Sequence, residues 1–251
     1  MKLQMRDALQ FKSIVEAVSS LVDEADFTLT PDGLKLRAMD PSHIAIVDLD
    51  MPKDSFEVYQ CDSSVRFRIS IDNFVKLLKR VETGEFMNLQ YDEKEKKVIL
   101  TMKSDMEREF IVPTLEPSKE ELQLPKLTLP TRVRLKSAAL QGLVEDTQIL
   151  STNVKISVTE DTLTMTSIGS MTTSKLTMVK DKSKALLELT TDKPAISVYN
   201  LNYMGEVINK GAKIAEEVTF NFSSNMPARI EFFMQKAGKI QYYVAPRIES
   251  E

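Results

Sequence analysis

Three aspartates that stand close together in the sequence, Asp40, Asp48 and Asp50, form the group of side chains best suited to metal chemistry. Asp48 and Asp50 alternate with apolar residues, so on a strand both carboxylates would lie on one face. Carboxylate oxygens are ligands that divalent cations prefer, and such a pair could serve a metal-dependent nuclease. An exposed acidic strand face explains the same residues without a ligand, and this is the interpretation that we favour.

No other pattern in the sequence points to catalysis. There is no GxSxG elbow, Gly-rich phosphate loop, HExxH or CxxC motif, and seven glycines in 251 residues leave little room for phosphate-cradling loops. His43 is the only histidine, so a hydrogen-bonding role in a pocket suits it better than metal ligation. The lone Cys61 agrees with a reducing compartment and predicts a buried structural thiol. We therefore expect a protein that is not an enzyme and that needs no metal or cofactor.

Composition limits how the chain can contact nucleic acid. A formal net charge of -4 argues against a protein that coats nucleic acid with its whole surface, so any such contact must be local. A hydrophobic content of 42% suffices for the core of one large domain or of two smaller ones. No run approaches the ~20 apolar residues of a membrane span, and the first residues do not read as a signal peptide. The sequence therefore predicts a soluble, intracellular protein with no membrane partner.

The two halves of the sequence resemble each other. Residues 27–49 align without a gap with residues 156–178 at an offset of 129, which is 156 minus 27. Identical residues coincide at Thr30/Thr159, Asp32/Asp161 and Leu34/Leu163. Both segments alternate apolar with polar residues around a short polar turn, as antiparallel strands do. The alignment predicts the same hairpin structure in each half.

Helical patterns also recur. Apolar residues at i, i+3, i+4 and i+7 spacing predict a helix within residues 11–22, and a second one follows at the same offset within residues 140–150. A further helix is expected where Phe74, Leu77, Leu78 and Val81 align with Leu201, Met204, Gly205 and Ile208 at an offset of 127, which is 201 minus 74. The strand sequences RISI and AISV precede these two helices, and residues 110–116 resemble residues 243–249.

Helices that are apolar on one face and alternate with antiparallel hairpins predict an α+β fold, in which helices cover one side of each sheet. Pro117, Pro125 and Pro130 disfavour a regular helix between the halves. We therefore predict an N-terminal domain over residues 1–115, an extended linker over residues 116–130 and a C-terminal domain over residues 131–251.

Three segments resemble the proliferating cell nuclear antigen (PCNA) family of DNA sliding clamps: LKLRAMDPSHIAIVDLDM at residues 34–51, ELQLP at residues 121–125 and YYVAPRIE at residues 242–249. Length, duplication and termini extend the resemblance over the whole chain. It implies two tandem clamp domains, each a duplicated βαβββ unit, with helices lining the hole of a ring and antiparallel sheets outside. Three subunits would close the ring, as a homotrimer or, alternatively, as part of a heterotrimer.

The resemblance also implies a function. The ring would encircle double-stranded DNA without reading its sequence, and would act as a processivity factor. Peptide motifs would tether the replicative DNA polymerase, the clamp loader, flap endonuclease, DNA ligase and other repair proteins. The resemblance favours an archaeal source, and an archaeal protein would be cytoplasmic. A eukaryotic member of the family would be nuclear.

The polar faces of the helices would line the hole. The resemblance places DNA-facing lysines at Lys12, Lys76 and Lys79, and we add the residues Arg80, Lys136, Lys210 and Lys213. Gln141 and Glu145 stand where the family often has arginines, so we expect an unevenly charged inner wall. An ordinary solvated helix face is the alternative for these lysines.

Apolar residues on an irregular linker predict that something covers them. By the resemblance, they belong to a pocket that receives short peptides with a glutamine and a small aromatic helical plug. The expected pocket comprises Met39, His43, Ile44, Ile46, Leu122, Leu124, Pro125, Pro227, Tyr243, Ala245 and Pro246. The alternative is a core between two domains, which would be the better explanation for Ile44 and Ile46 taken alone.

Contacts between subunits require strands with a free edge. The resemblance pairs a strand over residues 107–114 with a strand near residues 173–180 of the neighbouring subunit. The expected interface residues are Glu107, Glu109 and Ile111 on one side and Lys175, Leu176 and Lys180 on the other, with matching charge. Surface strands of separate sheets would explain the same residues.

Overall fold

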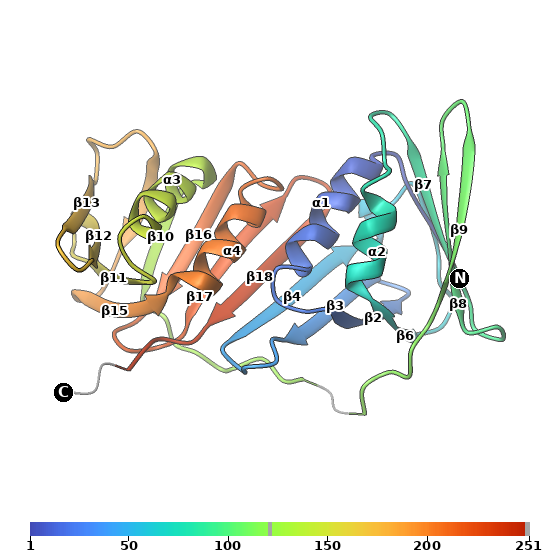
Figure 1. The fold of residues 1–251 in the computed structure, drawn as a ribbon, viewed down its shortest axis with the longest axis horizontal. Helices are drawn as coiled ribbons and strands as arrows, with labels where there is room; N and C mark the ends of the chain where they lie inside the picture. The colour runs from blue at the N-terminus through green and yellow to red at the C-terminus, as the bar shows by residue number, and fades with distance from the viewer. Residues whose placement is uncertain (120–121, 249–251) are drawn as a thin grey trace. The chain divides into compact units, whose positions relative to one another are not determined.

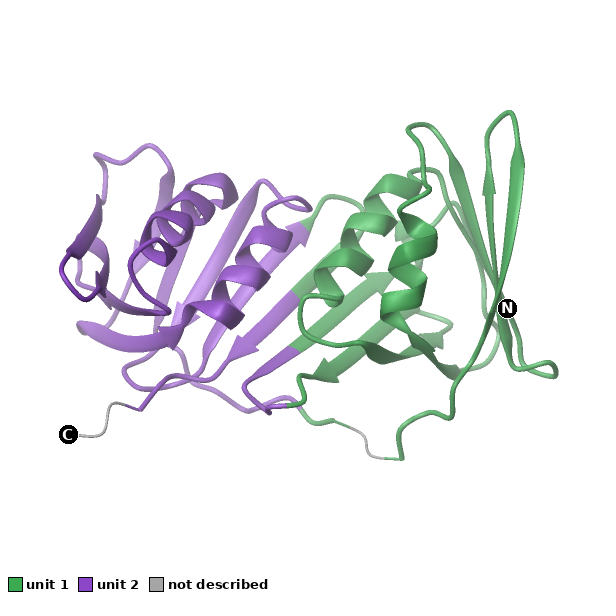
Figure 2. Ribbon diagram, viewed as in Figure 1, with its two compact units in different colours: residues 1–41, 47–123, 234–240 green, residues 42–46, 124–233, 241–251 purple. Residues whose placement is uncertain are grey.

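The computed structural model describes residues 1–119 and 122–248, in two compact units. Unit 1 comprises residues 1–41, 47–123 and 234–240, and unit 2 comprises residues 42–46, 124–233 and 241–251 (Figure 2). Residues 120–121 of the expected linker and residues 249–251 of the expected C-terminal domain lie outside the described residues.

Apart from residues 45 and 46, which belong to unit 2, unit 1 contains two successive βαβββ motifs (Figure 1). The first consists of β1 (Lys2–Met5), α1 (Ala8–Val18), β2 (Glu24–Thr30), β3 (Gly33–Met39) and β4 (Ala45–Pro52). After the short η1 (Lys53–Ser55) and β5 (Val58–Gln60), the second consists of β6 (Val65–Ser70), α2 (Ile71–Leu78), β7 (Phe86–Asp92), β8 (Lys97–Lys103) and β9 (Glu107–Pro113). The strands are ordered β5-β1-β7-β8-β9 in one sheet and β4-β3-β2-β6 in the other.

Unit 2 repeats this plan, apart from residues 234–240, which belong to unit 1. Its first motif consists of β10 (Thr131–Lys136), α3 (Ser137–Gln148), β11 (Asn153–Val158), β12 (Thr162–Ile168) and β13 (Thr173–Val179). After β14 (Leu186–Thr190), its second consists of β15 (Ala195–Asn200), α4 (Leu201–Gly211), β16 (Glu217–Phe222), β17 (Ala228–Met234) and β18 (Gly238–Val244). The strand orders are β13-β12-β11-β15 and β14-β10-β16-β17-β18. The predicted α+β class and the duplicated βαβββ motif are confirmed.

Capping residues fix where the helices begin. The side chains of Asp7, Ser70 and Asn200 precede α1, α2 and α4 and accept hydrogen bonds from backbone N–H groups of the first turn. Such a cap contributes about 1 kcal/mol to helix stability. In unit 1 the apolar faces of the helices meet where Phe11 of α1 and Phe74 of α2 pack edge to face, with ring centroids 6.2 Å apart.

Aromatic side chains contribute to the core of each unit. In unit 1, Phe67 stacks on Phe27 with ring centroids 5.6 Å apart and on Tyr91 at 4.6 Å. In unit 2, helix α4 lies so close to β17 that a Cβ added at Gly211 would come within 2.2 Å of the ring of Phe232. Only glycine permits this approach, which explains its place at the end of an amphipathic helix.

The predicted offset between the two halves is confirmed for the hairpins. For the second helix of each half, the predicted offset of 127 was wrong. Strands β2 and β11 begin 129 residues apart, which is 153 minus 24, as expected. Helices α2 and α4 begin 130 residues apart, which is 201 minus 71, and β6 and β15 have the same offset, which is 195 minus 65. Phe74 is therefore equivalent to Met204 and not to Leu201. A shift of three residues is nearly one turn of helix, so the apolar pattern alone could not exclude it.

The segment between β9 and β10 contains no helix and no named strand in its described residues, 114–119 and 122–130. Its only assigned pairing in that part is an isolated bridge between Leu115 and Arg68 of β6. This agrees with the effect expected of its three prolines. Elsewhere, none of the described helices combines the length and hydropathy that crossing a membrane would need.

Cys61 is buried, as predicted, and its Sγ donates a hydrogen bond to the carbonyl oxygen of Ser63 at 3.2 Å. Burial raises the pKa of this thiol, so the reactive thiolate is scarce at neutral pH. Cys61 therefore serves as a core residue.

Candidate functional site

Two of the three aspartates that suggested metal chemistry, Asp48 and Asp50, are paired with basic residues. Asp48 Oδ1 accepts a hydrogen bond from Arg37 Nε at 2.8 Å, and Asp50 Oδ2 lies 3.9 Å from Lys35 Nζ. The described residues contain no group of three or more His, Cys, Asp or Glu side chains that could hold a metal ion. Cross-strand ion pairs between β3 and β4 account for these carboxylates, and the nuclease alternative gains no support.

The basic residues expected on α2 are exposed, opposite its buried face. Lys76, Lys79 and Arg80 are exposed, whereas Phe74 and Leu78 on the opposite side have no exposed surface. All three cations lie at the C-terminal end of α2, where the helix dipole favours positive charge. Lys12, on the neighbouring α1, is half-buried. In Figure 1 the two helices lie side by side on one face of unit 1.

The helices of unit 2 carry a different charge pattern. Helix α3 contains no lysine or arginine, and Glu145 and Asp146 are exposed on it. Gln141 Nε2 donates a hydrogen bond to Glu145 Oε1 at 2.8 Å. The expected basic residues lie at helix ends: exposed Lys136 before α3, half-buried Lys210 in the last turn of α4, and exposed Lys213 beyond it.

Most of the expected pocket residues belong to unit 2. The turn before β4 and the residues after β18 are joined there, since Ala245 N donates a hydrogen bond to the carbonyl oxygen of Ile44 at 2.8 Å. His43 is exposed on this turn with a φ of 59°. Tyr243 is buried, while the remaining members in unit 2 are half-buried: Ile44, Ile46, Leu124, Pro125, Pro227, Ala245 and Pro246. Partial burial leaves each of them apolar surface for a ligand.

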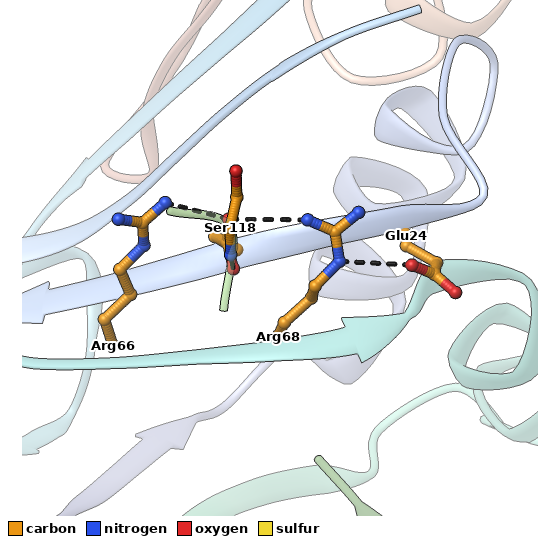
Figure 3. Close-up of polar contacts among 5 residues, drawn as sticks. Glu24, Arg66, Arg68 and Ser118 are labelled. Atoms are coloured by element: carbon orange, nitrogen blue, oxygen red, sulfur yellow. Dashed lines mark hydrogen bonds and ion pairs between the residues drawn. The ribbon is translucent and has the colours of Figure 1, made fainter. Parts of the chain in front are cut away.

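The other two expected pocket residues, Met39 and Leu122, lie in unit 1 and are both half-buried. Here the structure shows contacts to the linker that sequence reasoning missed. Arg37 Nη1 donates a hydrogen bond to the carbonyl oxygen of Leu122 at 3.1 Å. Ser118 N donates to the carboxylate of Asp26 at 3.2 and 3.3 Å, and Figure 3 shows Ser118 between Arg66 and Arg68. The linker is therefore held to unit 1 by side chains of β2 and β3.

The strands expected at subunit contacts both lie at sheet edges among the described strands. β9 ends the sheet β5-β1-β7-β8-β9, and β13 ends the sheet β13-β12-β11-β15. Glu107, Glu109 and Ile111 alternate along β9 and are exposed. On β13 and just after it, Lys175 and Lys180 are exposed and Leu176 is half-buried. Glu107 also forms an ion pair with Lys103 at 3.2 Å, so part of its charge is engaged within its own sheet.

Known proteins match the chain over nearly its whole length. It matches “Proliferating cell nuclear antigen, N-terminal domain” over residues 1–119 and “Proliferating cell nuclear antigen, C-terminal domain” over residues 123–247. “DNA polymerase sliding clamp 1” of Pyrobaculum aerophilum is 33% identical over 244 residues, which cover 97% of this chain and 96% of the relative. “DNA polymerase sliding clamp” of Nitrosopumilus maritimus is 30% identical over 239 residues, 95% of each chain.

Solved structures share the fold. PCNA from Thermococcus kodakaraensis superposes with a TM-score of 0.92 at 23% identity, covering 98% of this chain and 99% of that one. A chain of the PCNA2–PCNA3 complex from Sulfolobus tokodaii superposes with a TM-score of 0.91 at 24% identity, covering 99% and 100%. The tandem βαβββ motifs and both sequence matches lead to one conclusion: the chain belongs to the proliferating cell nuclear antigen family.

Proposed function

We propose that the chain is one subunit of a DNA sliding clamp, a ring that encircles duplex DNA and keeps DNA polymerase on its template. The observation that carries this proposal is the match to both family domains, over residues 1–119 and 123–247, in a chain whose two units repeat the same motifs. The work of such a protein is binding and not catalysis. It acts inside the cell, where its DNA is.

The domain boundaries follow from the same observations. We place the N-terminal clamp domain at residues 1–115, the linker at residues 116–130 and the C-terminal clamp domain at residues 131–251. Strand β9 ends at Pro113 and β10 begins at Thr131, which supports a linker between them.

The ring closes, in this proposal, when β9 of one subunit pairs with β13 of the next. Both strands offer an unpaired edge among the described strands, and such an edge is a template for another chain. Glu109 on β9 and Lys175 on β13 supply opposite charges. Because both halves of the contact lie on one polypeptide, a homotrimer is the favoured assembly.

Sliding requires attraction to phosphates without attraction to any one sequence. Lys12, Lys76, Lys79 and Arg80 in unit 1, with Lys136, Lys210 and Lys213 in unit 2, are proposed to face the DNA. Phosphate contacts of this kind position a protein on the duplex but carry no sequence information. The acidic α3 makes the attraction uneven between the units.

Partners dock, in this proposal, on the pocket formed by Met39, His43, Ile44, Ile46, Leu122, Leu124, Pro125, Pro227, Tyr243, Ala245 and Pro246. A replicative polymerase, clamp loader, flap endonuclease or DNA ligase would insert a peptide with a glutamine and an aromatic plug. Tethering raises the local concentration of the enzyme at its template without any change in its active site.

Size and topology test the proposal. In solution the chain should elute at three times 28.4 kDa and appear in electron micrographs as a ring with a central hole. Loaded by a clamp loader onto nicked circular DNA, it should stay bound until the DNA is linearised. A chain that stays monomeric until a related subunit is added would replace the homotrimer by a heterotrimer. Equal release from circular and linear DNA would overturn the clamp.

Replacing Lys76 and Lys79 together by alanine should shorten polymerase run length and flatten its dependence on salt. Each lost phosphate contact lowers the slope of log K against log salt by about 0.9. Primer extension with trapped polymerase, from low to moderate salt, measures both effects. The variant K182A/K184A is the matched control, because both lysines are exposed on the loop after β13 and not on a helix. Equal effects in the two variants would remove Lys76 and Lys79 from the DNA-facing set.

A further inference from the structure

The linker is attached to unit 1 at a buried carboxylate. Asp26 on β2 has only 8% of its surface exposed, and both of its carboxylate oxygens lie within 3.3 Å of Ser118 N. Arg66 Nη2 lies 2.9 Å and Arg68 Nη1 3.7 Å from the same Oδ2, and Arg68 Nε also pairs with Glu24 at 3.1 Å. In Figure 3 Arg66 and Arg68 lie on opposite sides of Ser118, and their dashed lines include the two ion pairs with Asp26. The arginines neutralise the carboxylate while it holds the linker backbone.

A second attachment lies at Leu122. The guanidinium of Arg37 binds Asp48 through Nε at 2.8 Å and donates through Nη1 to the carbonyl oxygen of Leu122 at 3.1 Å. A guanidinium is planar and rigid, so fixing one side of it on Asp48 aims the other. Asp48 is itself largely buried, with 13% of its side chain exposed. Its burial restricts the orientation of the Arg37 guanidinium.

The equivalent positions of unit 2 show that the fold does not need these charges. In both units the chain after the last strand crosses an edge strand: Leu115 N donates to Arg68 O at 2.8 Å, and Arg247 N donates to Val198 O at 2.7 Å. The side chains differ, however. By the offsets of 129 for β2 and β3 and 130 for β6, the counterparts of Asp26, Arg37, Arg66 and Arg68 are Lys155, Thr166, Ile196 and Val198.

Among the residues that the structure describes, the charged side chains at these positions thus belong to the unit whose chain continues as the linker. We propose that Asp26 and Arg37 are positioning residues, which hold the linker so that Leu122 and Leu124 stand ready for a partner peptide. This inference rests on the proposed peptide-binding function. Linker residues that are already held, at Ser118 and Leu122, lose less conformational freedom when the peptide binds, so their attachment raises affinity.

The test combines amide exchange with peptide binding, on the full-length chain. The probe is a fluorescein-labelled synthetic peptide with one glutamine followed by an aromatic helical plug. Asp26→Ala should speed hydrogen exchange of the Ser118 amide and weaken peptide binding about tenfold. Arg37→Ala should weaken binding to a similar extent. Lys35→Ala is the matched control, since Lys35 lies on the same strand and pairs with Asp50 at 3.9 Å; it should leave both measurements unchanged.

A conservative variant separates positioning from stability. In Arg37→Lys, the ammonium can still pair with Asp48 but cannot bind Asp48 and Leu122 together as a fork does. Arg37→Lys should therefore melt at the temperature of the wild type, while its peptide affinity should be as low as that of Arg37→Ala. Recovery of affinity along with stability would show a merely structural role for Arg37 and would overturn the inference for that residue.

Failure of this inference can be told from failure of the proposed function. If the wild type does not bind the peptide, or if Leu124→Glu binds it equally well, the pocket itself is refuted. If the wild type binds and Leu124→Glu does not, yet Asp26→Ala and Arg37→Ala bind like the wild type, the pocket stands and the positioning role is refuted. Unchanged exchange at the Ser118 amide in Asp26→Ala would refute that attachment without any reference to the peptide.

Discussion

Replacing Leu124 by glutamate is expected to weaken binding of the glutamine-and-aromatic peptide about 100-fold, while the fold and the assembly stay intact. A carboxylate in an apolar pocket loses hydration and gains no partner, and ~3 kcal/mol of such cost corresponds to this change in affinity. Leu124 belongs to no helix or strand and is only half-buried, so the fold does not depend on it. Isothermal calorimetry measures the affinity, and thermal unfolding confirms the fold.

Thr128→Glu is the matched control for this prediction. Thr128 is exposed on the same linker and gains the same charge, so its variant should bind the peptide as the wild type does. Equal losses in the two variants would indicate general repulsion of the peptide by negative charge. Wild-type affinity in Leu124→Glu would contradict the placement of the pocket on the linker.

Local sequence patterns predicted much of the fold. The hairpins of residues 27–49 and 156–178 could be aligned because turn residues such as Asp32 and Asp161 anchor the comparison at one position. The second helices offered no such anchor. Their apolar stripe repeats about every 3.6 residues, so an alignment three residues out of register matched almost as well. The caps Ser70 and Asn200, which the structure shows before both helices, would have fixed the register at 130.

For the candidate site residues, the sequence could predict side-chain exposure where a single helix determines it. The exposure of Lys76 and Lys79 opposite Phe74 follows from helical geometry alone, and the structure has it so. Contacts between distant segments could not be foreseen. Arg66 is 40 residues from Asp26, and Ser118 is 92 residues from it, so only the packed structure brings them together. The sequence held one signal of this attachment: Asp26 in the first repeat is equivalent to Lys155 in the second, so the charge at this position is not required by the fold.

The ion pairs between β3 and β4 show the same limit. Asp48 and Asp50 were recognised as sharing one strand face, yet Lys35 and Arg37 on the adjoining strand were not considered as their partners. Alternation within the sequence says which residues share a face, but the register between strands decides which of them meet.

Glu85 forms a buried ion pair with Arg108. Its side chain is 1% exposed and accepts hydrogen bonds from Arg108 Nη2, from Glu82 N at 2.8 Å and from Ser104 Oγ at 3.4 Å. Arg108 Nη1 also donates to the carbonyl oxygen of Arg80 at 2.8 Å. The pair thus ties β9, the strand proposed to join the next subunit, to the basic end of α2.

Glu85→Ala is expected to lower the free energy of unfolding by about 3 kcal/mol, because removing one partner of a buried pair leaves the other uncompensated. Denaturant unfolding at fixed protein concentration measures this loss, since assembly would make stability depend on concentration. Glu116→Ala is the control. Glu116 and Lys96 lie 3.4 Å apart on the surface with 91% and 71% of their side chains exposed, so its loss should change stability little.

The same pair should make stability sensitive to acid, and Glu85→Gln isolates that effect. Burial acts to raise the pKa of Glu85, but the hydrogen bonds from Glu82 and Arg108 outweigh burial and hold the pKa below its usual value. A carboxyl group whose pKa is lowered by folding stabilises the protein above its unfolded pKa, about 4.3, and loses this contribution as the pH falls through the folded value. The stability difference between wild type and Glu85→Gln should therefore be constant at neutral pH and shrink below about pH 4. A difference that stays constant into strong acid would show that Glu85 stabilises the fold by packing rather than by charge.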